Sequence, residues 1–318
     1  MIAVPRKTKQ YLLAAAKVLV LGLTFGYIFY KLKNNATVNL QEFLVTVFSK
    51  GTISGYLLLL FLILAAANWF FEILKWQTLV STFEKISFSM ALKQSLASLT
   101  VSMATPNRIG EYGAKALFFE PKMRKKILLL NLFSSGAQMF ATTLFGVIGL
   151  FYIMRNFGIN YSLSTLVFFG IATAILIAIA YYFKEKDLIL KGFSIGKTIR
   201  FFKKIPFQIK FKTVVFSVLR YSIFSGMFYG LLLFFGAEIS IGEAAPFIFA
   251  MYFLSSVLPS IFILDVVIRG GVAVWLFSII EISELTVLSA VLAMWLLNFA
   301  IPSIIGSFFV LTFQPTTR

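Results

Sequence analysis

The residues best suited to chemistry stand close together in Thr105–Lys115, which reads Thr-Pro-Asn-Arg-Ile-Gly-Glu-Tyr-Gly-Ala-Lys. This stretch brings Arg108, Glu111 and Lys115 into a chain that otherwise consists mostly of uncharged apolar segments. Pro106 suits the first turn of a helix, where its missing N–H has no partner in any case, and the threonine before it can cap that turn. On such a helix Arg108, Glu111 and Lys115 share one face, because they follow one another at i,i+3 and i,i+4 spacing.

This stretch is predicted to bind an anion such as a phosphate group. The first N–H groups of a helix lack partners and carry partial positive charge, and Arg108 adds planar donors that stay charged. Thr105 and Asn107, at the start of the stretch, are assigned to the same site. The alternative interpretation is a cytoplasmic helix cap whose solvated ion pair contributes little to stability.

A second charged group stands nearer the C-terminus, where Asp265 and Arg269 have i,i+4 spacing and can pair on one helix face. They follow a Leu-Pro-Ser sequence at 258–260, and apolar residues stand on both sides of them. A charge pair in such surroundings is costly in lipid and marks a candidate functional site; the alternative is a purely structural salt bridge. Arg220 lies inside another apolar run, where it either reaches the inner surface or faces the cavity as a second phosphate ligand.

The composition indicates what surrounds these residues. Of the 318 residues, 59% are hydrophobic and 13% are charged, whereas soluble domains carry about 25% charged residues. The chain is therefore expected to be a polytopic membrane protein. Because it has no His and no Cys, it lacks the usual proton shuttle and the commonest metal ligand, and we expect no metal or other cofactor. The net charge of +17 comes from loops between apolar spans, which favours membrane lipids and not nucleic acid as the partner.

Apolar runs long enough to cross a bilayer predict about six full spans. They are Tyr11–Tyr30, Gly51–Phe71, Ile127–Met154, Asn156–Phe183, Thr213–Ala237 and the run from Leu285 to the C-terminus. Pro302 is expected to kink the last span four residues after Asn298. Glu72 and Lys75, at the inner end of the second span, are interpreted as an interfacial pair that reaches toward the headgroups.

Two other segments are short or interrupted. Gln94–Asn107 holds too few uncharged residues to cross and contains several Ser and Thr, which predicts a re-entrant element near residues 91–115. Charges and glycines predict a second, broken segment near residues 255–281. Irregular backbone within a membrane is tolerated where it is buried in protein or lines a wet cavity, so both segments are expected to border such a cavity.

The chain is expected to form a single transmembrane domain over residues 1–318, with halves at 1–183 and 213–318. Between them, residues 184–212 carry nine Lys/Arg interleaved with Phe, which predicts a cytoplasmic interfacial loop on an anionic inner leaflet. The cation distribution places both termini in the cytoplasm at a bacterial-type plasma membrane, although residues 31–50 carry three lysines on the assigned outer side.

Interrupted segments at matching places in the two halves, entering from opposite sides, predict an inverted repeat whose parts meet near the midplane. The expected fold class is therefore an all-α polytopic membrane protein of about six full spans plus two re-entrant or broken helical hairpins.

The Thr-Pro-Asn-Arg-Ile-Gly-Glu sequence at 105–111 resembles a motif in the transmembrane region of lysylphosphatidylglycerol synthases and of related stand-alone flippase-like integral membrane proteins. That family carries Thr-Pro-Gly-Arg-Ile-Gly-Glu-like residues after its early helices, and a second motif with Pro, Gly, Arg and Glu toward its C-terminal end. Asn107 departs from the family Gly, and the region of Asp265 and Arg269 lacks the Gly-rich run and the Arg-x-Glu order. The resemblance implies lipid translocation between leaflets. Synthase activity is not expected, because the chain stops at Arg318 without the soluble domain that transfers the aminoacyl group.

Three functions stay open on the sequence. The first is a non-enzymatic flippase or lipid-binding transporter, in which Arg108, Arg269 and Lys115 hold a lipid phosphate. Glu111 and Asp265 would then orient these cations or meet a cationic headgroup. The second is an intramembrane transferase acting on polyprenyl-phosphate lipids, with the same two carboxylates as candidate bases. The third is a membrane scaffold that does not transport, in which Arg108 and Glu111 are replaceable.

Overall fold

The computed structural model describes residues 51–103, 105, 108–157, 194–257 and 264–314, together with Leu19, and of residues 51–54 and 264–268 the backbone alone. Every secondary-structure element within these ranges is helical. The elements are α3 (Gly51–Val80), α4 (Phe88–Met103), α5 (Gly110–Leu117), α6 (Arg124–Asn156), α8 (Ile195–Lys204), α9 (Phe207–Phe234), α10 (Ile241–Val257), α11 (Leu264–Ser278), α12 (Glu284–Trp295), the π-helical turn η2 (Leu296–Ala300) and α13 (Ile301–Leu311).

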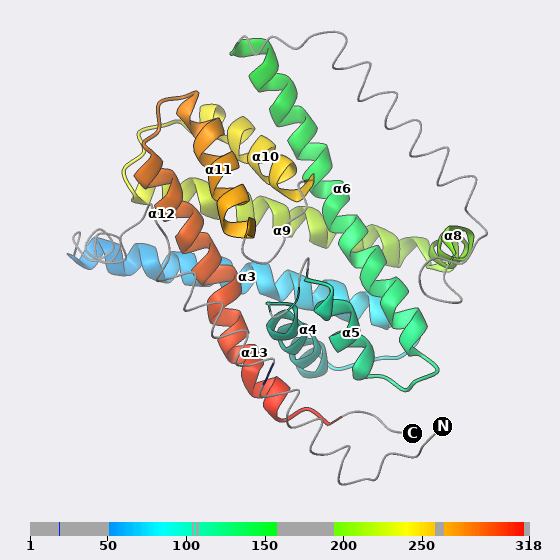
Figure 1. Cartoon of the computed structure of the whole chain (residues 1–318). Helices are drawn as coiled ribbons and strands as arrows, with labels where there is room; N and C mark the ends of the chain where they lie inside the picture. Colours follow the sequence, from blue (N-terminus) through cyan, green and yellow to red (C-terminus); the bar gives the residue numbers. More distant parts are fainter. Residues whose placement is uncertain are drawn as a thin grey trace.

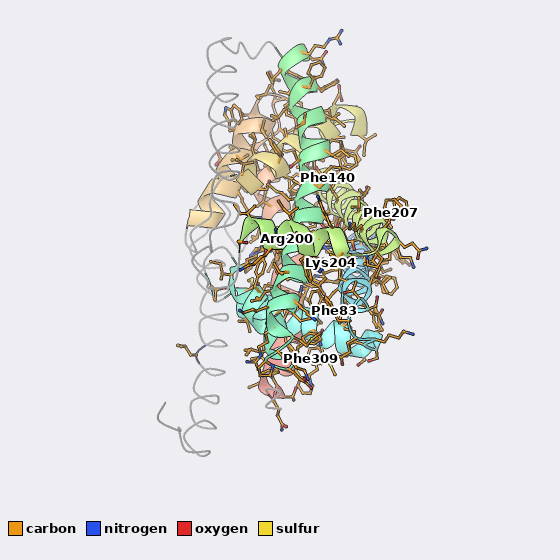
Figure 2. The ribbon with its side chains drawn as sticks, turned by 90° about the vertical axis from the view of Figure 1, so that its right-hand side faces the viewer. Phe83, Phe140, Arg200, Lys204, Phe207 and Phe309 are labelled. Carbon is orange, nitrogen blue, oxygen red and sulfur yellow. The ribbon has the colours of Figure 1, made fainter. Side chains whose placement is uncertain are left out.

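Four helical stretches among the described residues are long and apolar enough to cross a membrane. They are Gly55–Val80, Arg124–Asn156, Phe207–Phe234 and Glu284–Leu311. Large apolar side chains are exposed along them, such as Phe140 on α6 (Figure 2) and Phe308 on α13, as expected of surfaces that face lipid. These features confirm the predicted all-helical, multi-pass membrane class. The predicted span Tyr11–Tyr30, apart from Leu19, and residues 158–183 of another span lie outside the described residues.

Among the described helices the order long, short, short, long occurs twice, with α12, η2 and α13 taken together as one stretch, Glu284–Leu311. Between α3 and α6 stand α4 and α5, of 16 and 8 residues, and between α9 and α12 stand α10 and α11, of 17 and 15 residues. In Figure 1, α3 and α9 lie side by side and run in opposite directions, with the α4–α5 hairpin on one side of this pair and the α10–α11 hairpin on the other. The segment predicted near residues 91–115 thus contains α4 and α5, and the segment predicted near residues 255–281 contains the end of α10 and all of α11.

Each hairpin packs closely against a long helix through a glycine. A Cβ on Gly149 of α6 would overlap the carbonyl oxygen of Pro246 in α10, and a Cβ on Gly306 of α13 would overlap the carbonyl oxygen of Leu96 in α4. Small residues permit such backbone contact, which supplies much of the attraction between helices in lipid. The long helix α6, and α13 at the end of the long stretch Glu284–Leu311, therefore hold the short helices in place.

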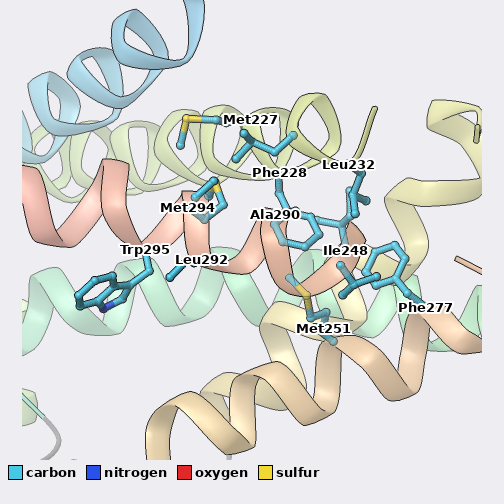
Figure 3. Packing of buried hydrophobic residues seen from close by; sticks show 14 of the residues in the cluster. Met227, Phe228, Leu232, Ile248, Met251, Phe277, Ala290, Leu292, Met294 and Trp295 are labelled. Atoms are coloured by element: carbon cyan, nitrogen blue, oxygen red, sulfur yellow. The ribbon is translucent and has the colours of Figure 1, made fainter. Parts of the chain in front are cut away.

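The larger apolar core lies where α9, α10, α11 and α12 meet. Phe228, Ile248, Phe277 and Ala290 are each 1% exposed or less and come from these four helices (Figure 3). Because the side chains interdigitate here, the second hairpin is fixed mainly by apolar packing.

The basic segment contains a helix where the sequence predicts a loop. Its residues 184–193 lie outside the described residues, but Ser194 caps α8 by accepting a hydrogen bond from the Lys197 N–H at 3.1 Å. Arg200 and Lys204 lie on α8 in Figure 2 and are exposed, and α9 already begins at Phe207, six residues earlier than the predicted Thr213. The cap at Ser194 starts α8, and Pro206 cannot continue it. The chain therefore leaves the helical conformation between α8 and α9.

Candidate functional site

A polar cavity of about 310 Å³ lies among α3, α4, α5, α6, α9 and η2. Its charged lining residues, within the described part of the chain, are Glu72, Lys75, Arg108, Glu111, Lys115 and Arg220. Arg108, Glu111, Lys115 and Arg220 are thus brought together, as the sequence predicts for a shared site. The cavity is therefore lined by four cations and two carboxylates. Charged side chains are costly inside a membrane protein, so this cluster is a candidate functional site.

Glu72 is the centre of this charge cluster. Its carboxylate contacts the Arg220 guanidinium and lies 2.8 Å from the Lys75 Nζ and 3.9 Å from the Lys115 Nζ. The side chains of Lys75 and Lys115 are 2% and 1% exposed, and that of Glu72 is 10% exposed. A carboxylate shared by three cations stabilises all of them against desolvation, so Glu72 holds the cluster together.

The prediction that Glu72 and Lys75 form an interfacial pair is wrong. Helix α3 continues to Val80 instead of ending near Phe71, so both residues lie well inside it and are buried against other helices. The signal for this was present in the sequence. After Lys75, α3 continues with mostly uncharged residues, so the charge pair does not mark the end of the helix.

Helix α5 brings Glu111 and Lys115 to the cavity. The Lys115 ammonium donates to Glu111 at 2.7 Å and to the Asn131 side-chain oxygen at 2.9 Å. It also lies 4.4 Å from the centre of the Trp76 ring, whose indole N–H donates to the Gln94 side-chain oxygen at 2.7 Å. Glu111 and Lys115 form the predicted i,i+4 pair, and a cation–π contact helps to hold the buried ammonium.

The helix start predicted at Thr105 and Pro106 is wrong by about one turn. Helix α5 begins at Gly110, whose N–H donates to the Thr105 hydroxyl at 2.8 Å. Arg108 therefore stands in the preceding turn with φ of 56°, a left-handed conformation that non-glycine residues seldom adopt. It does not share a helix face with Glu111. Thr105 thus stabilises the start of α5 from five residues away, because its hydroxyl accepts a hydrogen bond from an N–H that has no partner within the helix.

This turn directs Arg108 toward η2. Its guanidinium carbon lies 4.2 Å from the centre of the Phe299 ring. Stacking on an aromatic face suits the planar guanidinium and leaves the donors at its edge directed sideways. Arg108 lines the polar cavity and also the neighbouring one described below.

Arg220 faces the cavity instead of reaching the inner surface. Besides Glu72, it donates to the side-chain oxygens of Asn68 and Gln138, each at 3.2 Å. It lies near the middle of α9, a helix of 28 residues, and 19% of its side chain is exposed. The structure therefore favours the second of the two interpretations that the sequence left open for Arg220.

A π-helical turn in the last span supplies Asn298, a residue to which the sequence analysis gave no role. The Asn68 side-chain amide donates to the Asn298 side-chain oxygen at 2.9 Å, and the Trp69 indole N–H donates to the Asn298 backbone carbonyl at 3.1 Å. That carbonyl is four residues before Pro302, which has no N–H to offer it. Pro302 thus leaves the Asn298 carbonyl as an acceptor for Trp69, and the turn η2 directly precedes the helix α13 that contains the proline predicted to kink this span.

A second cavity of about 80 Å³ adjoins the first and has mainly apolar walls. Arg108 and Arg269 both line it, together with aromatic residues that include Phe224, Tyr252 and Phe299. The Tyr252 hydroxyl is buried without a hydrogen-bond partner. Arg108, Phe224 and Phe299 also line the polar cavity, so the two spaces share a wall.

Two predicted site residues lie outside what the structure describes. Asn107 is not described at all, and of Asp265 the backbone alone is described, on α11 one turn before Arg269. Among the described residues, no three carboxylate, His or Cys side chains are grouped so that they could hold a metal ion. The arrangement is suited instead to binding an anion between cationic donors.

Comparisons of this chain with models of known protein families, with curated proteins and with solved structures find no match. The site itself therefore provides the argument about function.

Proposed function

We propose that this protein binds the phosphate-bearing headgroup of an anionic lipid in the polar cavity and moves that lipid between membrane leaflets. The observation that carries the proposal is the cavity of about 310 Å³ in which Arg108, Lys115 and Arg220 face the same space as the carboxylates Glu72 and Glu111. Charged side chains at such a place are costly, and they commonly mark the path of a polar substrate.

The adjoining apolar cavity supports a lipid as the ligand. Arg108 lines both cavities, beside Phe224 and Phe299. A molecule whose phosphate lies at Arg108 would therefore have a charged space on one side and an aromatic one on the other. Only an amphiphile uses both kinds of lining, whereas a free ion uses the polar one.

The two carboxylates support a carrier that releases its ligand. Bare arginines would bind a phosphate tightly through paired, charge-assisted hydrogen bonds. Glu72 and Glu111 compete for the same donors, because they already contact Arg220 and Lys115. A site for a transported molecule has to bind weakly enough to let it go.

We further propose an inverted repeat, with the site where the two halves meet and with about six full spans. The repeated long–short–short–long order of helices supports it, as do Arg108 at the first hairpin and Arg269 in the second, which line one cavity. In this arrangement both termini and the basic helix α8 face the cytoplasm of a bacterial-type plasma membrane. The likeness of residues 105–111 to the flippase-like family motif agrees with the proposal.

Leaflet exchange in reconstituted vesicles tests the proposal. Acyl-chain-labelled lipids that bear phosphate headgroups are placed in vesicles with the purified protein, and exchange is followed by quenching of the outer leaflet. We expect exchange with the natural chain and its loss in Arg108→Ala. Lys122→Ala is the matched control, because Lys122 is 78% exposed and pairs with Glu120 away from the cavity.

The two other functions are distinct outcomes of the same assay. Formation of a modified lipid without exchange would replace the proposal by an intramembrane transferase. Absence of both exchange and product with every lipid, in a protein that remains folded, would support a scaffold instead.

A further inference from the structure

We propose that the polar cavity selects a headgroup with at least two negative charges, a phosphomonoester or diphosphate, over one with a single charge or none. This inference rests on the proposed function and specifies the class of lipid. It follows from the balance of charges around the cavity and from the buried hydroxyl of Ser95, a residue in the cavity wall.

The described residues around the polar cavity carry a surplus of two positive charges. The cations are Lys75, Arg108, Lys115 and Arg220, and the carboxylates are Glu72 and Glu111. Removing charge from water is costly unless opposite charge is nearby, so a ligand that brings two negative charges complements the part of the lining that these described residues form. A phosphomonoester carries about −1.5 to −2 charges at pH 7, and nearby cations favour its fully ionised form.

Ser95 gives an independent indication that an oxygen-rich ligand belongs here. It lines the cavity, its residue is 3% exposed, and its hydroxyl has no hydrogen-bond partner. A buried hydroxyl without a partner is unusual in folded proteins, because leaving it unsatisfied costs free energy. A phosphate oxygen would accept a hydrogen bond from it. A terminal phosphate has three such oxygens, whereas a phosphodiester has two non-bridging oxygens that share a single negative charge.

Common lipid headgroups differ in how well they balance the positive charge of the cavity and accept a hydrogen bond from Ser95. A phosphodiester with an alcohol headgroup brings one negative charge, so the lining keeps a surplus. A zwitterionic headgroup also brings an ammonium, and this repels Arg108 and Lys115. The terminal phosphate of a phosphomonoester or a diphosphate lipid meets both the charge surplus and the donor at Ser95.

Competition between lipids with identical chains tests the inference. A chain-labelled dioleoyl phosphatidic acid is bound to the purified full-length protein in detergent. It is then displaced by unlabelled dioleoyl phosphatidic acid, phosphatidylglycerol or phosphatidylethanolamine. We expect phosphatidic acid to compete about ten- to a hundredfold better than phosphatidylglycerol, the gain typical of additional charge-assisted contacts. Phosphatidylethanolamine should compete least.

Charge-changing variants test the cause of this preference. Arg108→Gln lowers the surplus by one charge and should reduce the preference for phosphatidic acid about tenfold, whereas Glu111→Gln raises the surplus and should strengthen it. Ser95→Ala should weaken the binding of phosphatidic acid more than the binding of phosphatidylglycerol. Lys122→Gln removes an exposed cation outside the cavity lining and should leave the preference unchanged. Thermal unfolding of each variant establishes that it is folded.

The outcomes separate this inference from the proposed function. Equal competition by phosphatidic acid and phosphatidylglycerol, or an unchanged preference in Arg108→Gln, would overturn the selection for two charges and leave a lipid carrier standing. Failure of every lipid to bind would overturn both proposals. Inorganic phosphate that displaced the labelled lipid at the same concentration as phosphatidic acid would mark a site for the free ion.

Discussion

The two short-helix hairpins occupy similar places in the fold but are held by different forces. The first, α4–α5, packs near the polar cavity and includes buried Lys115, which is fixed by an ion pair, an amide and an indole ring. The second, α10–α11, supplies Phe247, Ile248 and Phe277 to the apolar core and contributes Tyr252 and Arg269 to the lining of the apolar cavity. One hairpin is positioned by directional polar contacts and the other by packing.

This difference indicates that the two hairpins have different roles in the site. Polar contacts have defined distances and angles, so the first hairpin can present charged groups in a fixed arrangement. Apolar packing is less directional and tolerates several side-chain conformations, especially with methionine such as Met251 or Met294 in the wall. Substitutions of Glu72 and Tyr252 test these separate forces, and substitutions of the contact glycines and of Trp69 test packing and a polar contact elsewhere in the fold.

The largest effect is expected from Glu72→Gln. The change leaves three buried or half-buried cations without their shared carboxylate, which should lower the free energy of unfolding by about 3–5 kcal/mol. Denaturation in detergent micelles measures this. Adding Lys75→Met should restore part of the loss, because one of the buried cations is then removed. A Glu72→Gln protein as stable as the natural chain would show that polar contacts do not hold the first hairpin.

Substitution of the two contact glycines should affect both hairpins alike. Gly306→Ala and Gly149→Ala each place a methyl group against a backbone carbonyl, which we expect to cost about 1–3 kcal/mol of stability. The matched control is Gly136→Ala on α6, where a Cβ meets nothing within 4 Å and should stabilise the helix by up to about 1 kcal/mol. Thermal unfolding compares the three. Similar values for Gly136→Ala and Gly149→Ala would contradict the close packing of α6 against α10.

Trp69→Phe should destabilise the protein by about 1–2 kcal/mol, because the Asn298 carbonyl that Pro302 leaves free then loses its indole donor. A smaller aromatic ring remains at this half-buried position, so the change removes the hydrogen bond while keeping part of the packing. Chemical unfolding gives the value. Pro302→Ala, which restores a backbone N–H, should make the same Trp69 substitution less costly, and an equal cost in both backgrounds would refute this account of the turn.

The smallest effect is expected from Tyr252→Phe in the second hairpin. The tyrosine hydroxyl is buried without a partner, so its removal sacrifices no hydrogen bond and should change stability by less than about 0.5 kcal/mol or raise it slightly. The same unfolding assay applies. A loss comparable to that in Trp69→Phe would mean that the apolar cavity depends on polar contacts after all, and the contrast between the hairpins would fail.

Part of the fold was predictable because it depends on composition and local spacing. The apolar runs predicted the spans that the structure describes, and the short Ser/Thr-containing segment near residue 94 predicted that α4 does not cross by itself. Helix boundaries were less predictable. Residues beyond Phe71 continue α3, and α5 starts at Gly110, because tertiary contacts such as the Thr105 hydroxyl decide where a helix begins.

The sequence by itself determined the membrane class, the interruption of two segments and the pair Glu111–Lys115, since residues four apart on a helix meet whatever surrounds them. The tertiary structure alone decided that Glu72 meets Arg220, 148 residues further along the chain. It also decided that Arg108 and Arg269 line one cavity. Such partners depend on how whole helices pack against one another. The number of residues between two helices in the sequence does not say how close the helices lie in the folded protein.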